Sequence, residues 1–251
     1  MEASVSQGVA QSLGQFVQEY SQHDTGGTWQ LENKKCLEIK LSGNRVFTKV
    51  GAMCAYYGDI KFTRSGSGGA SKWLKSKVTG EGVTTMDCEG NGILYVADQG
   101  KEITILQLNG ETIYVDGRDC LAYSETLEWD IVMSGRAGMM AGGLFSLKLA
   151  GHGLVAITTE GPPLVLGVSP QVPLFTDGDA TVAWSDGLSM SMKADVNWKT
   201  LVGKSSGETV QMQFTGTGFV VLQPFEEASG GAAAAGGGGG GGLNLGGLLG
   251  G

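Results

Sequence analysis

Side chains able to do chemistry are few and widely scattered in this 251-residue chain. Its two histidines, His23 and His152, lie far apart in the sequence, and His152 stands inside a Gly-x-Gly stretch that favours a solvated turn. A cupin-type iron, manganese or zinc centre needs a His-x-His pair with further ligands. We therefore predict no catalytic residue, no metal site and no cofactor. A cysteine–histidine nucleophile pair brought together by the fold is the enzymatic alternative.

Motifs for phosphate and nucleic acid are incomplete. Gly203-Lys204-Ser205 resembles the end of a Walker A loop, but Trp198 occupies the position of the required glycine. The one basic cluster consists of Lys72, Lys75 and Lys77 around Trp73, which we interpret as a solvated loop. The net charge of −8 repels polyphosphate. We expect no strong nucleic-acid binding.

The remaining candidate ligands have structural interpretations. Asp177 and Asp179 flank Gly178, and aspartate tolerates the unusual backbone angles of such a turn without calcium. The cysteines are widely spaced and form no C-x-x-C motif; they are Cys36, Cys54, Cys88 and Cys120. Free thiols favour a reducing compartment, so we expect a cytoplasmic protein. No apolar run approaches 18 residues, which predicts no transmembrane span and leaves peripheral membrane association open.

The elements that must position these side chains repeat along the chain. Gly-x-Gly closes three alternating segments, at 84–92, 145–153 and 210–218, and a short apolar run follows each. Period-two alternation is typical of half-buried strands, so we expect a glycine-turned hairpin in each copy. An alanine followed by an aromatic residue marks the same period, at Ala55-Tyr56, Ala122-Tyr123 and Ala183-Trp184.

These signals predict an all-β body of three repeated β units. We place the body at residues 28–227, with units at about 28–98, 99–160 and 161–227. Linkers between the units are absent, and about 60 residues of strand make a marginal core, so one three-lobed body is expected.

Two segments flank the body. Residues 1–27 carry apolar side chains at helical spacing, and we expect a short amphipathic helix that docks on the body, with membrane or partner docking as the alternative. The apolar positions are Val5, Val9, Leu13, Phe16, Val17 and Tyr20. Residues 228–251 contain 13 of the 44 glycines, so a disordered tail is expected there.

Several motifs resemble one family. The segment 51–58 reads GAMCAYYG and precedes Gly80-Glu81-Gly82, and a closing segment combines Ser206-Gly207-Glu208, Gln211-Met212 and residues 218–224, GFVVLQP. Together they resemble the mitochondrial-biogenesis family named for altered inheritance of mitochondria, over about residues 28–225. Ala52 departs from the serine usual in the family. The first 33 residues contain no Arg or Lys, unlike a mitochondrial transit peptide.

The resemblance carries expectations of its own. It implies a fold like that of the tryptophan-RNA-binding attenuator protein, a short double-stranded β-helix repeated three times per chain, with assembly into rings or trimers. It also implies relatives that support inner-membrane architecture in mitochondria, and it supplies no catalytic residue.

We therefore expect a non-enzymatic, self-assembling scaffold or adaptor, a homo-oligomer such as a trimer with a further, unidentified protein partner. The alternative is a binding module that holds a small molecule or nucleic acid between lobes or on an oligomeric ring.

Overall fold

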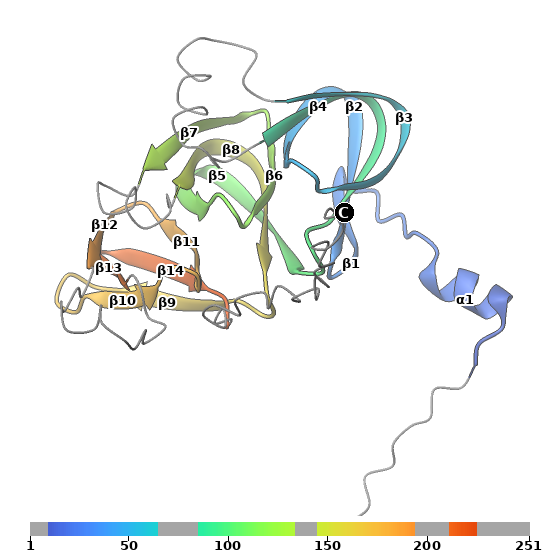
Figure 1. The fold of residues 1–251 in the computed structure, drawn as a ribbon. Helices are drawn as coiled ribbons and strands as arrows, with labels where there is room; N and C mark the ends of the chain where they lie inside the picture. The colour runs from blue at the N-terminus through green and yellow to red at the C-terminus, as the bar shows by residue number, and fades with distance from the viewer. Residues whose placement is uncertain (1–9, 65–84, 134–144, 194–210, 225–251) are drawn as a thin grey trace, which may run out of the picture.

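The all-β prediction is confirmed by a computed structural model, which describes residues 10–64, 85–133, 145–193 and 211–224 (Figure 1). One short helix, α1 (Leu13–Tyr20), precedes the strands. The strands are β1 (Trp29–Asn33), β2 (Cys36–Lys49), β3 (Met53–Arg64), β4 (Thr85–Val96), β5 (Glu102–Asp116), β6 (Cys120–Ser124), β7 (Leu127–Met133), β8 (Phe145–Thr159), β9 (Leu164–Val168), β10 (Leu174–Asp177), β11 (Thr181–Ser185), β12 (Leu188–Lys193), β13 (Gln211–Gly216) and β14 (Gly218–Leu222).

The strands form two antiparallel sheets. The larger sheet follows the order β3-β4-β2-β6-β8-β5-β11-β14-β9, with β1 added on β2 and β7 on β8. The smaller one has the order β10-β13-β12. Strands β3 and β9 therefore end this path of the larger sheet, and β10 and β12 end the smaller one.

The first group of strands, β2, β3 and β4, is folded back on itself. Lys49 at the end of β2 lies opposite Thr85, whereas Met53 at the start of β3 lies opposite Val96, at the other end of β4. The chain from Lys49 to Met53 spans about 14 Å at most, but a straight 12-residue strand extends roughly 36 Å. Strand β4 must therefore bend, and Figure 1 shows β2, β3 and β4 curving together.

Glycines make this bend possible. Gly90 has φ +143°, and a Cβ built on it would collide with the carbonyl oxygen of Asp59 on β3. A Cβ on Gly92 would collide with the Tyr57 carbonyl oxygen in the same way.

The predicted hairpin at Gly90-Asn91-Gly92 is wrong, because these residues lie inside one continuous strand. Gly151 to Gly153 likewise lie within β8, so the second predicted hairpin is wrong as well.

The third Gly-x-Gly segment, residues 216–218, separates two strands that belong to different sheets. Strand β13 pairs with β10 and β12, and β14, which begins at Gly218, pairs with β9 and β11. The chain thus passes from one sheet to the other instead of turning back on itself, and this predicted hairpin is also wrong.

The second group (β5 to β8) and the third group (β9 to β14) use the pairing pattern of the first. In the second group the central strand is β8, which pairs with β5 on one side and with β6 and β7 on the other. In the third group β13 and β14 together take the central place. Strand β13 pairs with β10 and β12, and β14 pairs with β9 and β11. A register shift recurs at one place in each group, at Met53/Ala55, Cys120/Ala122 and Thr181/Ala183.

Buried side chains connect the groups into one body. The first core cluster combines residues of β2 and β4, such as Ile39 and Leu94, with Leu121 and Ala156 of the second group. A second cluster centred on Tyr123 includes three residues of the third group, Val182, Ala183 and Val221. The groups therefore share their apolar interior.

Helix α1 differs from its prediction in length and position. It begins at Leu13 after the N-cap Ser12, whose hydroxyl accepts from the Gln15 backbone N–H in a capping box. Residues 10–12, which fall inside the predicted helical spacing, are not helical, and the predicted positions Val5 and Val9 lie outside the described residues. No residue of α1 is buried, and the helix stands apart from the sheets (Figure 1). The prediction that it docks on the body is wrong. The predicted tail, 228–251, lies outside the described residues.

Candidate functional site

Backbone pairing between β2 and β6 joins the first and second groups. Val46, Phe47 and Thr48 lie opposite Ser124, Tyr123 and Ala122, respectively. The rings of Phe47 and Tyr123 stack, with centroids 4.9 Å apart and planes at 21°. Direct cross-strand aromatic pairs of this kind stabilise sheets, and here they hold two groups together.

A second junction of the same design joins the second and third groups. Ile113, Tyr114 and Val115 of β5 lie opposite Ser185, Trp184 and Ala183 of β11. The rings of Tyr114 and Trp184 lie almost parallel, with centroids 5.7 Å apart and planes at 4°. The two junctions therefore share one residue pattern. One strand supplies an aliphatic residue, an aromatic residue and then Thr or Val, and the opposite strand supplies Ala, an aromatic residue and Ser.

One half of this junction recurs on β3. In each group an alanine directly follows the register shift and lies opposite a residue of the central strand. Ala55 lies opposite Tyr95 on β4. Ala122 lies opposite Ala156 on β8, and Ala183 lies opposite Val221 on β14. We call Ala55, Tyr56 and Tyr57 the β3 edge.

The other half recurs on β10. Phe175 lies opposite Gln213 on its central strand, as Phe47 lies opposite Asp87 and Tyr114 opposite Lys148. Leu174, Phe175 and Thr176 form what we call the β10 edge. Its sequence closely resembles that of Val46 to Thr48.

Each edge carries a partly exposed aromatic ring, although Thr176 of the β10 edge is buried. Tyr56 is 47% exposed and Phe175 46%, whereas Tyr123 and Trp184 are buried at the two internal junctions. Ala55 is exposed, although Ala122 and Ala183 are buried. Within the described residues, β3 pairs with β4 alone and β10 with β13 alone. Within the described residues, the β3 edge therefore presents unpaired backbone N–H and C=O groups on its outer side, where another strand can be added.

Ion pairs close the turns beside the junctions. Arg118, in the turn before β6, pairs with Asp116 and reaches Asp179 in the third group. The Lys49 ammonium lies 2.8 Å from Asp98 and donates to the Arg118 carbonyl oxygen at 2.7 Å. These bonds cross both junctions on the same side of the molecule as the predicted Asp177–Asp179 turn.

A buried carboxylate belongs to the same turns. Asp119 is 1% exposed and accepts a hydrogen bond of 2.9 Å from the Lys101 ammonium. Burial raises the pKa of Asp119 to about 6, because desolvation of its charge outweighs the attraction of Lys101. The group has a structural role, since its backbone carbonyl also accepts from Thr158.

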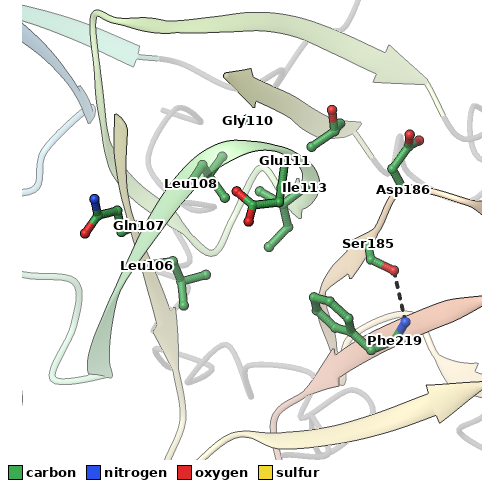
Figure 2. Close-up of a pocket in the computed structure, with 10 residues that line it drawn as sticks. Leu106, Gln107, Leu108, Gly110, Glu111, Ile113, Ser185, Asp186 and Phe219 are labelled. Atoms are coloured by element: carbon green, nitrogen blue, oxygen red, sulfur yellow. Dashed lines mark hydrogen bonds between the residues drawn. The ribbon is translucent and has the colours of Figure 1, made fainter. Parts of the chain in front are cut away.

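A cleft of about 590 Å³ lies beside the junction of β5 and β11 (Figure 2). Leu106, Leu108 and Phe219 contribute apolar walls, and Glu111 and Asp186 contribute carboxylates. Among the described residues of the lining there is no lysine or arginine. The cleft therefore suits an uncharged or cationic small molecule better than a phosphate.

The residues weighed for chemistry do not come together. His152 lies exposed within β8, opposite Asn109, so it is a strand residue and not the turn residue predicted. His23 precedes the sheets and donates its backbone N–H to Glu32. No group of three potential metal ligands occurs among the described residues. The lysine cluster around Trp73 and the Gly203-Lys204-Ser205 segment lie outside them.

The two buried cysteine side chains, Cys88 and Cys120, favour the thiol form. Burial raises the pKa of Cys88, and it raises that of Cys120 to about 12. All four cysteines are free. Thiols with raised pKa values are poor nucleophiles, because the thiolate is the reactive form.

Comparison with known proteins decides the family. The family model described as mitochondrial biogenesis AIM24 matches residues 29–225. The chain belongs to this family. The range agrees with the resemblance at residues 28–225 and covers every described strand.

A solved structure shares the fold of this AIM24-family chain. The crystal structure of protein SPYM3_0169 from Streptococcus pyogenes superposes with a TM-score of 0.65 at 20% identity, covering 79% of this chain and 93% of the other. None of the curated proteins matches the sequence. Among the described residues, no helix has the length and apolar character needed to cross a membrane.

Proposed function

We propose that this AIM24-family protein is a non-enzymatic, self-assembling scaffold or adaptor. One observation carries the proposal: the β3 edge has the alanine–aromatic pattern of the two junctions that already hold the groups together, and β3 pairs only with β4 among the described residues. Exposed strand edges with matching aromatic residues are typical templates for pairing with another chain. The assembled sheet would present a larger surface for a partner protein.

We further infer that the chain consists of three copies of one β unit, close to the predicted boundaries. The recurring register shift before Ala55, Ala122 and Ala183 supports this, as does the shared pairing of each central path. A chain of three similar units with matching ends is suited to extension by further copies.

The proposed location is a reducing compartment, for which the cytoplasm is our expectation. The free thiols support it, because Cys54 is exposed and would be open to oxidation elsewhere. Helix α1 is the part of the described chain best placed for contact with a membrane or a partner, since Leu13, Phe16, Val17 and Tyr20 are exposed on it.

Size-exclusion chromatography with light scattering tests the proposal. We expect a mass that is a multiple of the 26.0 kDa chain at micromolar concentration. A mass of one chain over the whole concentration range would refute self-assembly.

The cleft favours a second candidate function, the binding of a small uncharged or cationic molecule. Its apolar walls and two carboxylates support this version over nucleic acid, since the part of the lining that the structure describes offers no cation to a phosphate. Replacing Leu108 with Arg inside the cleft would abolish such binding in a ligand screen by thermal shift. If ligands bind equally well to this variant, the cleft is not their site.

A further inference from the structure

We propose that the outer side of strand β9 pairs with the same strand of a second copy, in one antiparallel register about a two-fold axis. In that register Leu166 lies opposite Leu166 of the other copy, and Val165 lies opposite Gly167. We call this surface, Leu164–Val168 on the side away from β14, the β9 edge. The inference rests on the proposed self-assembly and adds a second contact surface to it.

The β9 edge is open and apolar. Of the strands that the structure describes, β9 ends its path of the larger sheet and pairs with β14 alone. Leu164 is 53% exposed and Val165 58%. All five residues of β9 are uncharged, although the chain carries a net charge of −8. Two acidic copies repel each other least where one uncharged edge meets the same uncharged edge, and an exposed apolar edge strand is a template for a further strand.

A strand already occupies the equivalent edge in the first group. Val168 pairs with Gly218, and Leu41 pairs with Gly92, each glycine being the last of a Gly-x-Gly segment. On this alignment β9 corresponds to residues 37–41 of β2, where β1 lies antiparallel on the outer side. The backbone path of these groups therefore accepts an added antiparallel strand at this position.

The same alignment identifies the backbone groups that face outward. The Lys40 N–H donates to the carbonyl oxygen of Thr28, the residue before β1, at 2.7 Å. Lys40 corresponds to Gly167, and outward-facing residues alternate along a strand, so Gly167 and Val165 direct their N–H and C=O groups away from β14. A Val165–Gly167 pair between copies therefore exchanges two hydrogen bonds, and the two-fold axis creates two such pairs.

The residues that flank β9 restrict the pairing to this register. Because a two-fold axis keeps both copies on the same face of the sheet, the neighbouring registers differ by two residues. One of them places Pro163, which has no N–H to donate, opposite Gly167. The other places Ser169 opposite Val165, but the Ser169 carbonyl already accepts from the Val172 N–H.

The side chains fit the register. Leu166 meets its own copy at a non-hydrogen-bonded position, where opposed side chains lie closest. Nothing lies within 4 Å of a Cβ added to Gly167. This open space lets the incoming Val165 reach Phe219, which lies opposite Gly167 on β14 and is 39% exposed. A contact between identical surfaces closes at two copies, so the β3 edge stays available for further assembly.

Disulfide trapping with a single variant tests the register. Leu166→Cys would be made in the full-length chain with Cys54→Ser, which removes the exposed native thiol. Opposed residues in antiparallel strands have Cβ atoms close enough for a disulfide, so oxidation of the assembled protein should give a two-chain band. Leu164→Cys in the same background is the control, because residue 164 lies opposite residue 168 and about 13 Å from residue 164 of the other copy. It should give at most one-fifth of the yield, although Leu164 is the more exposed side chain.

The outcomes separate the register from self-assembly. Cross-linking of Leu164→Cys as strong as that of Leu166→Cys would overturn the register. An oligomer by light scattering that gives no 166–166 cross-link would overturn the β9 contact and leave self-assembly through the β3 edge intact. A protein that stays monomeric refutes both.

A second variant separates pairing from folding. Val165→Arg places a long charged side chain at an exposed position, so the monomer should keep its melting temperature while the contact dissociates at least tenfold more readily. Ser189→Arg, at an exposed position on β12, is the control and should leave assembly unchanged. Equal dissociation constants for the two variants would contradict the assignment of the β9 edge.

Hydrogen exchange distinguishes a second copy from a different partner. The Gly167 N–H should exchange at least tenfold more slowly in the assembled wild type than in Val165→Arg. If it becomes protected only when an uncharged, valine-rich peptide is added to monomeric protein, the edge belongs to another partner and pairing with a second copy is wrong.

Discussion

At the scale of single residues, two tyrosine hydroxyls lie in opposite environments. The Tyr95 hydroxyl donates to the buried Glu38 carboxylate at 2.8 Å, and Glu38 also accepts from Gln30 at 3.0 Å. The hydroxyl of buried Tyr123 makes no hydrogen bond of normal geometry to a described residue. A buried polar group without a partner costs free energy, whereas removing one partner of a buried carboxylate leaves that group unsatisfied.

We therefore predict different effects for the same substitution. Tyr95→Phe should lower the free energy of unfolding by about 1–3 kcal/mol, and Tyr123→Phe should leave it unchanged or raise it. Urea unfolding followed by tryptophan fluorescence measures both. An equal loss in the two variants would contradict these assignments.

Asp119 predicts a dependence on pH. Its pKa of about 6 lies above the ordinary value of an unfolded aspartate, so the folded state binds the proton more tightly. The contribution of Asp119 to stability is present below about pH 4 and is lost as the pH rises through 6. Relative to Asp119→Asn, the wild type should lose at most about 1.4 kcal/mol per pH unit between pH 4 and 6.

Unfolding midpoints of the wild type and Asp119→Asn from pH 4 to 6.5 check this dependence. Glu128→Gln, at an exposed position on β7, is the control and should run parallel to the wild type. A difference between wild type and Asp119→Asn that stays constant or grows with pH would disprove the raised pKa.

Sequence reasoning found one half of the residue pattern at the junctions. The alanine–aromatic marker at positions 55, 122 and 183 lies on strands β3, β6 and β11, but in the sequence alone it indicates only a period. The partner segments, such as Val46 to Thr48, lie far along the chain from the residues they pair with. No local spacing reports such long-range pairing. The burial of Asp119 could not be predicted either, because it depends on contacts with residues distant in the sequence, such as Thr158.

At the scale of elements, the glycine bends show what local sequence cannot distinguish. A hairpin turn and a bend within a strand both require glycine, and both separate two alternating segments. Whether the segment at Gly90 forms a hairpin turn or a bend within a strand depends on β3. The β3 backbone lies so close to Gly90 and Gly92 that neither position has room for a side chain. Strand type and the all-β class could therefore be predicted, whereas the path of the chain at Gly-x-Gly could not.

This account predicts a position-specific cost of adding one methyl group. Gly90→Ala should lower the free energy of unfolding by about 3 kcal/mol, because it combines an unfavourable φ with a collision against the Asp59 carbonyl. Gly167→Ala on β9 is the matched control, since nothing lies within 4 Å of its added Cβ. That variant should be neutral or gain up to about 1 kcal/mol. Similar losses in both variants by urea unfolding would show that the bend does not depend on close backbone contact.

At the scale of the whole molecule, the described strands form three groups with two internal junctions. Core clusters combine buried residues of neighbouring groups. Family membership agrees with the resemblance, and the similar structure from Streptococcus pyogenes supports the fold. Self-assembly remains our proposal, and it explains why aromatic residues suited to a junction are exposed on β3.

The mass of the protein in solution tests this account most directly. Light scattering across a dilution series of the full chain should give an assembly of several 26.0 kDa chains, and Ala55→Arg should shift it toward a single chain while Ser189→Arg does not. A wild-type mass of one chain at every concentration would contradict the account.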